Sequence, residues 1–197
     1  SKSTHQYHNT DVVIIGAGLS GLAAAKKFIN TKYQVLLIEQ DCYFGGILKN
    51  SNKVKTINGL TPQEWISETE ELILNSKNIT TLKNTLVTTY NFTNHLIALE
   101  DKFAGKKIDL NKSELTLHKI RTSNTIITNG HIERFISFRN NDLPGVMLAS
   151  SFEKYIHRYG VVPEKEPVIF TNNSSSLSLL KKLVSLGCKP KAYIDSR

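Results

Sequence analysis

The sequence has few cysteines and no long apolar segment. Its two cysteines, Cys42 and Cys188, lie far apart and form no C-x-x-C pair, which argues against dithiol chemistry and against a zinc or iron–sulfur centre. No apolar run approaches the roughly 20 residues that a membrane-spanning helix needs. Residues 1–10 (SKSTHQYHNT) also lack the hydrophobic segment of a signal peptide. We therefore expect a cytoplasmic protein without a metal site.

Positive charge is in excess but is not concentrated in one place. The net charge is +8, yet the lysines are scattered along the chain and are not gathered with interleaved aromatic residues. We interpret them as a solvated surface and expect no nucleic-acid partner. At 197 residues with 40% hydrophobic content, the chain is long enough to bury a core.

The most informative segment is 11–39, which reads DVVIIGAGLSGLAAAKKFINTKYQVLLIE. An apolar strand is followed by Gly16, Gly18 and Gly21 in G-x-G-x-x-G spacing, then by a helix and a second apolar strand. The first glycine allows a sharp turn, the second a close approach to a pyrophosphate, and the third close packing of the helix on the sheet. The N-terminus of that helix offers free N–H groups to the phosphates.

Glu39 ends the second strand, where a carboxylate can accept both ribose hydroxyls of an adenosine and disfavours a 2′-phosphate. Strand, turn, helix, strand and acid in register predict a dinucleotide-binding site. The doublet Gly45-Gly46 follows shortly afterwards, and two interpretations stay open: a loop that crosses near the nucleotide, or a plain turn.

The rest of the chain predicts an α/β fold with a Rossmann-like parallel sheet. Thr61-Pro62-Gln63-Glu64 is a capping box that opens a helix with an apolar face of Trp65, Ile66, Leu72 and Ile73. Residues from about 79 to 121 read as strands of a small antiparallel β-meander, residues 124–128 as a return strand, and residues 146–159 as a helix ended by Gly160.

Residues 167–197 repeat the strand, turn, helix and strand pattern, with Asp195 in the place of Glu39. The turn holds Asn172, Asn173 and three serines instead of glycines, so we expect a degenerate second nucleotide-binding unit. Only two strands of that unit are present, which indicates a fragment of a longer polypeptide. The predicted organisation is a linker at 1–10, a first dinucleotide-binding domain at 11–160, and the start of a second, truncated unit at 161–197.

Several segments together resemble the alpha subunit of heterotetrameric sarcosine oxidase, a member of the two-dinucleotide-binding flavoproteins. They include DVVIIGAGLSGLAAA at 11–25, FGG at 44–46, TTYNFTNHLIALE at 88–100, NDLPGVMLAS at 141–150 and the RYG that ends at Gly160. The chain departs from the family pattern at Thr128-Asn129-Gly130, where Ala-Thr-Gly is usual, and at Phe135, where proline is usual.

The resemblance implies a noncovalent NAD at the first fingerprint, with FAD as the alternative because both contain ADP. The expected nucleotide contacts are Gly16, Gly18, Leu19, Ser20, Gly21, Glu39, Gln40, Gly46, Ile47, Val87 and Gly130. The Val87 contact is expected through its backbone, on the strand below the adenine.

The resemblance also implies oxidative demethylation of sarcosine to glycine, within a hetero-oligomer that holds FAD or FMN on partner subunits and tetrahydrofolate elsewhere. We find no acid, base or nucleophile set for catalysis here, so we expect this segment alone to be inactive. Two alternatives stay open: an FAD-dependent amine or opine-type dehydrogenase subunit, and a non-catalytic nucleotide-binding assembly module.

Overall fold

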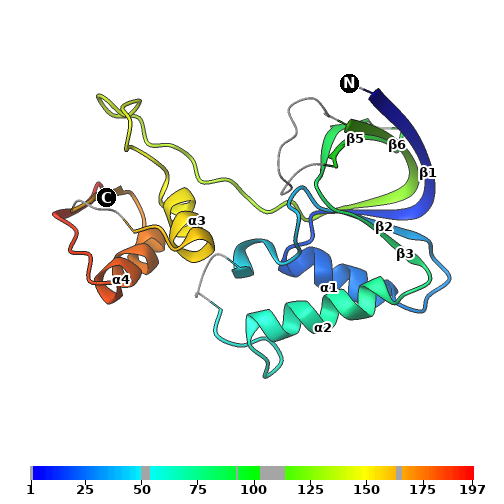
Figure 1. Cartoon of the computed structure of the whole chain (residues 1–197), viewed down its shortest axis with the longest axis horizontal. Helices are drawn as coiled ribbons and strands as arrows, with labels where there is room; N and C mark the ends of the chain where they lie inside the picture. Colours follow the sequence, from blue (N-terminus) through cyan, green and yellow to red (C-terminus); the bar gives the residue numbers. More distant parts are fainter. Residues whose placement is uncertain (1, 50–53, 92, 103–113, 163–165) are drawn as a thin grey trace. The chain divides into compact units, whose positions relative to one another are not determined.

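The computed structural model describes residues 2–49, 54–91, 93–102, 114–162 and 166–197. They form two compact units, one from the described residues within 1–48 and 56–130 and one from those within 49–55 and 131–197 (Figure 1). The division falls at Gly130, earlier in the chain than the boundary predicted at residue 160. In this division the helix that ends before Gly160 lies in the second unit, whereas the sequence placed it in the first domain.

The first unit is built on a six-stranded sheet with the strand order β3-β2-β1-β6-β5-β4. The strands are β1 (Lys2–Ile15), β2 (Val35–Ile38), β3 (Ile79–Leu82), β4 (Thr85–Tyr90), β5 (His95–Asp101) and β6 (Glu114–Ile127). Strands β3, β2, β1 and β6 pair in parallel, whereas β5 pairs antiparallel with both β6 and β4. The predicted α/β fold with a parallel sheet and antiparallel strands is confirmed.

Two strands differ from the prediction in position. β3 pairs in parallel with β2, so residues 79–82 belong to the parallel sheet and not to the meander. β6 is continuous from Glu114 to Ile127, where two separate strands were predicted, and pairs with β1 over its whole length. The stretch around Ser123 contains no glycine or proline that would break the strand, so the pairing with β1 continues on both sides of it.

The predicted N-terminal linker was also wrong, because β1 begins at Lys2. Its first half is polar and shows no hydrophobic periodicity, which is why the sequence did not reveal a strand. Backbone pairing with β6 supports it, together with polar side-chain pairs such as Thr4 Oγ1 and Thr116 Oγ1, 3.0 Å apart.

The core of the first unit lies on both faces of the parallel strands, and β2 is buried along all four residues. On one face, Val13, Leu36 and Ile38 pack against side chains of the antiparallel strands, namely Leu96, Ala98 and Ile120. The sheet therefore curls over itself on this side, as the curved β1, β6 and β5 show in Figure 1. This packing buries the strands that lead to the glycine turn.

Two helices pack against each other in the first unit, α1 (Leu19–Phe28) and α2 (Pro62–Leu74), beside the strands (Figure 1). The predicted capping box opens α2: the Glu64 N–H donates to Thr61 Oγ1 at 3.3 Å, and the Thr61 N–H donates to Glu64 Oε2 at 2.8 Å. The Thr61 N–H and, after it, the Thr61 hydroxyl donate to Glu64 Oε2 and lower the pKa of the Glu64 carboxyl below its usual value, because these hydrogen bonds stabilise its charged form.

The predicted apolar face of α2 is correct except at Leu72. Trp65, Ile66 and Ile73 are buried, but Leu72 is 46% exposed. At about 100° per residue, Thr69 and Ile73 lie near the centre of the buried stripe of α2 and Leu72 lies at its edge, where its side chain is only partly covered.

The second unit contains α3 (Ala149–Tyr159), a two-stranded parallel sheet of β7 (Val168–Thr171) and β8 (Ala192–Asp195), and α4 (Leu177–Ser185). Its core gathers Ile156, Ile169, Leu179 and Leu183 from three of these elements. The strand, turn, helix and strand predicted for 167–197 are confirmed. Gly187 has a φ of 78° directly after the α4 C-cap, the conformation predicted for a glycine that ends a helix.

The neighbouring isomers Ile73 and Leu72 give a direct test of this packing. Ile73→Ala is expected to lower the free energy of unfolding by about 2–5 kcal/mol, because Ile73 is fully buried and its truncation leaves a cavity. Leu72→Ala is the matched control and is expected to change it by about 0.5 kcal/mol or less. Urea unfolding measures both, and equal losses would contradict the orientation of α2.

Candidate functional site

The glycine turn joins the end of β1 to the start of α1. Gly16 has a φ of 96°, a conformation that strains any residue with a side chain, and its N–H donates to the carbonyl oxygen of Ile38 at 2.8 Å. Gly18 is the N-cap of α1, and among the described residues no side-chain hydrogen bond caps that helix. The first-turn N–H groups are therefore available to the anion that the sequence predicts there.

Gly21 sets how closely α1 approaches the turn. A Cβ built on Gly21 would lie 1.8 Å from the carbonyl oxygen of Gly16 and 2.8 Å from Oγ1 of Thr128. Backbone therefore fills the space that a side chain would need, and only glycine fits. The predicted packing role of Gly21 is confirmed.

Gly18 differs from Gly21, because a Cβ there would meet no described protein atom within 4 Å. Its backbone, with φ −74° and ψ −167°, is also one that alanine adopts. Neither packing nor conformation requires a glycine at this position. An open space beside the helix N-terminus fits the predicted pyrophosphate.

The loop that holds Gly45 and Gly46 runs against this turn. The Gly45 N–H donates to the carbonyl oxygen of Ala17 at 2.8 Å, and a Cβ on Gly46 would lie 3.2 Å from the Cα of Gly18. The short helix η1 (Gly46–Lys49) follows, with Phe44 fully buried just before the doublet. Of the two open interpretations, the structure favours a loop that passes beside the fingerprint.

Glu39 is buried at 7% exposure and its carboxylate faces the turn. Oε2 accepts the Ala17 N–H at 2.7 Å and Oε1 accepts the Asp41 N–H at 2.9 Å. A carboxylate offers about four lone-pair positions, so two backbone donors leave acceptor capacity for ribose hydroxyls. These bonds also hold the carboxylate in one orientation beside the glycines.

The remaining predicted contacts are placed as follows. Leu19 and Ser20 begin α1 with exposed side chains, Gln40 follows Glu39 and is exposed, and Ile47 in η1 is 56% exposed. Val87 lies in β4, opposite Ala98. β4 starts beside Glu39, because the Thr85 N–H donates to the Glu39 carbonyl oxygen at 2.9 Å.

Gly130 follows the end of β6 with a φ of 69° and is exposed. A Cβ there would meet no described atom within 4 Å, so the structure brings Gly16, Gly18, Gly21, Glu39 and Gly46 together but assigns Gly130 no packing role.

Sequence reasoning missed the part played by Thr128. Its Oγ1 lies 2.8 Å from the carbonyl oxygens of both Ile15 and Gly16, and its N–H donates to the Ile15 carbonyl oxygen at 2.8 Å. Thr128 therefore ties the end of β6 to the glycine turn. In the sequence, only the departure from the family pattern marked this position. The contact itself could not be inferred without knowing that β6 lies next to β1 in the sheet.

The corresponding turn of the second unit is hydrogen-bonded within itself. Asn173 Oδ1 accepts the Ser175 N–H at 2.8 Å, and the Asp195 carboxylate is bound by the guanidinium of Arg197, with Nε 3.0 Å from Oδ1. Hydrogen bonds from Arg197 lower the pKa of the Asp195 carboxyl below its usual value. The residue in the place of Glu39 thus already has a cationic partner.

No cluster of three or more His, Cys, Asp or Glu side chains suited to a metal ion occurs within the described ranges. Across the same ranges, no helix is long and apolar enough to cross a membrane.

The sheet and the glycine turn define a Rossmann-like fold of the FAD/NAD(P)-binding type. Solved structures with this fold include L-proline dehydrogenase from P. horikoshii, with a TM-score of 0.69 at 20% identity, covering 99% of this chain and 36% of that one. The HOCl-induced flavoprotein disulfide reductase of Escherichia coli gives a TM-score of 0.57 at 13% identity, covering 93% and 41%. The Thi4 family profile matches residues 1–54.

Among curated proteins, the chain is homologous along nearly its whole length to sarcosine oxidase alpha subunits. It is 30% identical to the subunit of Corynebacterium sp. strain U-96 over 98% of this chain, and 31% identical to that of Rhizobium meliloti over 95%. The resemblance stated from the sequence is confirmed. The chain spans only 20% and 19% of the length of these relatives.

Gly21 and Gly18 form a matched pair for testing the turn. Gly21→Ala is expected to destabilise the fold by several kcal/mol, because overpacking against a rigid backbone oxygen forces the helix away from the turn. Gly18→Ala is expected to leave the thermal unfolding midpoint unchanged, since its Cβ meets no described protein atom. Equal destabilisation by the two substitutions would contradict the geometry of the turn.

Proposed function

We propose that this chain is the dinucleotide-binding part of a sarcosine-oxidase-type alpha subunit, and that residues 16–39 bind the ADP portion of NAD. The observation that carries the proposal is the space at Gly18. It lies beside an uncapped helix N-terminus and the loop at Gly46, with the Glu39 carboxylate held across the turn.

The residues present fit a dinucleotide. N–H groups at the start of α1 donate to the pyrophosphate, and the absent Cβ of Gly18 lets the backbone approach it. Glu39 accepts ribose hydroxyls with its free lone pairs, and its negative charge disfavours a 2′-phosphate. Gln40, Ile47 and the backbone of Val87 contribute to the surroundings of the nucleotide. The bound nucleotide supplies redox capacity that no side chain here has.

Substrate chemistry takes place outside this chain in our proposal. The names of the homologous relatives support sarcosine as the substrate and a multi-subunit assembly as the context. The flavin that accepts electrons from the amine lies on a partner subunit, and tetrahydrofolate binds elsewhere in the complex. The assembly is cytoplasmic and heterotetrameric, and this segment without its partners is inactive.

The second unit is degenerate in this proposal and binds no dinucleotide. The Asn173 side chain already accepts the Ser175 N–H at the start of the helical turn, and the Arg197 guanidinium already binds the carboxylate of Asp195. A dinucleotide there would have to displace both.

The identity of the nucleotide is tested by purifying the protein with its partner subunits, separating this chain and analysing what denaturation releases by chromatography and mass. NAD is the expected result. FAD would assign the site to a flavin and favour an amine dehydrogenase, and the release of no nucleotide would favour an assembly module.

A binding measurement with Gly18→Ala tests the site itself. A methyl group at this position is expected to weaken NAD binding about tenfold or more, at unchanged stability, because it occupies the space of the pyrophosphate. NADP is expected to bind the unsubstituted protein more weakly than NAD, since Glu39 repels a 2′-phosphate. Unchanged affinity in Gly18→Ala would place the nucleotide elsewhere.

A further inference from the structure

Three polar side chains from three strands form a hydrogen-bonded chain inside the first unit, away from the glycine turn. His8 of β1 places Nε2 2.8 Å from Nδ1 of His118 in β6. His118 in turn places Nε2 3.2 Å from Oε2 of Glu100 in β5. The two imidazole rings are 5.1 Å apart between centroids, and the His118 side chain is completely buried.

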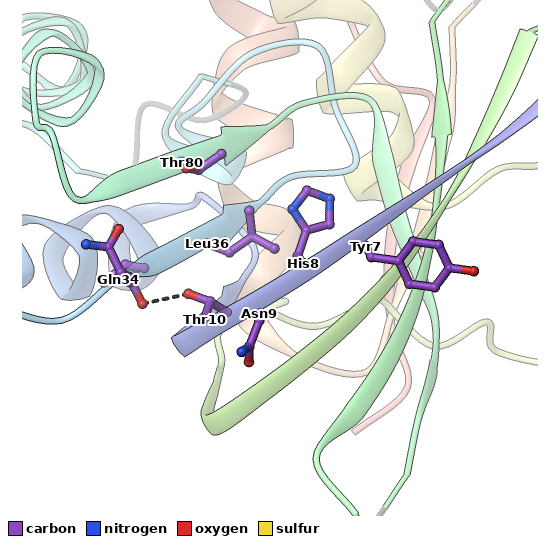
Figure 2. Close-up of a pocket in the computed structure, with 8 residues that line it drawn as sticks. Tyr7, His8, Asn9, Thr10, Gln34, Leu36 and Thr80 are labelled. Carbon is purple, nitrogen blue, oxygen red and sulfur yellow. Dashed lines mark hydrogen bonds between the residues drawn. The ribbon is translucent and has the colours of Figure 1, made fainter.

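One end of this chain reaches a surface pocket of about 250 Å³, lined by His8 with Asn9, Thr10, Gln34 and Leu36 among others (Figure 2). A water molecule takes roughly 30 Å³, so the pocket holds several waters, but it is smaller than the usual site of a drug-sized ligand. His8 therefore contacts solvent, whereas His118 does not.

The charged and titratable groups around His8 are few. From β6 and β5 they are His118 and Glu100, while β2, β3 and the loop before β2 contribute only uncharged side chains to the pocket, such as Gln34 and Thr80. Tyr7 also lines the pocket but leaves β1 in a different direction from His8 (Figure 2), with Lys119 Nζ 5.5 Å from its ring centre.

The hydrogen bonds define which nitrogen carries each proton when both rings are neutral. An ionised carboxylate only accepts, so His118 donates from Nε2 to Glu100 and keeps a lone pair on Nδ1. His8 must then donate from Nε2 to that lone pair. Its own Nδ1, which no described residue bonds, is left as an acceptor.

We propose that His8, His118 and Glu100 form a proton-linked switch, in which uptake of one proton from the pocket reverses the hydrogen bond between the two imidazoles. The proton binds to Nδ1 of His8, and the proton on His8 Nε2 moves to Nδ1 of His118. The imidazolium of His118 then donates to His8 through Nδ1 and to the Glu100 carboxylate through Nε2. No hydrogen bond is lost, and the new positive charge lies beside a negative one.

The reversal changes what His8 presents to the pocket. Before proton uptake its Nδ1 is an acceptor, and afterwards Nδ1 carries a hydrogen and is a donor. The charge appears on the buried His118, whereas the neutral ring of His8 changes from a hydrogen-bond acceptor to a donor toward the pocket.

A second proton is opposed by the same geometry. Two imidazolium rings with nitrogens 2.8 Å apart would repel, and neither could accept the hydrogen bond. Burial, and after it the charge of His118, lower the pKa of His8 below its ordinary 6.5. The trio therefore holds one extra proton and excludes another.

The direct test is nitrogen NMR of the ¹⁵N-histidine-labelled protein as a function of pH, which reports on each ring nitrogen separately. As the pH falls, His118 is expected to become protonated on both nitrogens while His8 changes from the Nε2–H to the Nδ1–H neutral form. Protonation of both nitrogens of His8 with His118 still neutral would overturn the proposal, as would two titrations without any tautomer change.

A variant tests the part of the carboxylate. Glu100→Gln keeps the shape of the side chain but removes its charge, and is expected to weaken uptake of the proton about tenfold or more. Glu68→Gln, an exposed position on α2, is the matched control and is expected to leave the titration unchanged. Unaltered proton uptake in Glu100→Gln would overturn the proposal.

The same cluster predicts a pH dependence of stability. The pKa of His8 is lowered in the folded chain, so as the pH falls the unfolded chain protonates this imidazole before the folded chain does. The contribution of neutral His8 to the free energy of unfolding is fully present above the ordinary pKa of 6.5 and is lost between 6.5 and the lower pKa of the folded state. Urea unfolding near neutral pH and at about pH 5.5 measures the loss, which His8→Gln should reduce. An identical loss in His8→Gln and in the unsubstituted protein would contradict this assignment.

Discussion

The site depends on one close backbone contact, where the first residues of α1 pass the end of β1. The carbonyl oxygen of Gly16 occupies the place of a Cβ on Gly21, so strand and helix meet at backbone distance. Three further contacts depend on that approach: Thr128 bonds to the turn, Glu39 accepts the Ala17 N–H, and the loop at Gly46 lies against Gly18. The helix N-terminus then points into open space with its N–H groups uncapped, which suits an anionic ligand.

The parallel strands hold this contact in place because they are buried on both faces. On one face the sheet covers itself, with β5 and β6 packed over β1 and β2. The pairing of β1 and β6 extends well beyond the nucleotide-binding part, and polar side chains of the two strands form pairs such as Thr4 with Thr116 and His8 with His118. A hydrogen-bonded pair lowers the cost of burying polar groups, and such pairs also fix strand register.

Local sequence predicted the elements whose signals are strong and short in range. The glycine spacing, the apolar run of β2, the capping box at Thr61 and the repeat at 167–197 were all recognisable, because each rests on backbone conformation or burial within a few residues. Contacts between distant segments were not recognisable. The strand at 2–10 is polar and forms only because β6 pairs with it, and the placing of α3 in the second unit depends on packing around Ile156. Leu72 lies at the edge of the apolar face of α2, where tertiary packing decides whether a side chain is covered.

The central claim is that an ADP group binds at the turn between Gly16 and Glu39. The measurement that tests it most directly is a crystal structure of the protein with ADP, the part that NAD and FAD share. Our account predicts the pyrophosphate beside the Gly18 backbone and the N-terminus of α1, with the ribose hydroxyls on the Glu39 carboxylate. ADP bound elsewhere on the chain, or bound at the turn without contact to Glu39, would contradict it.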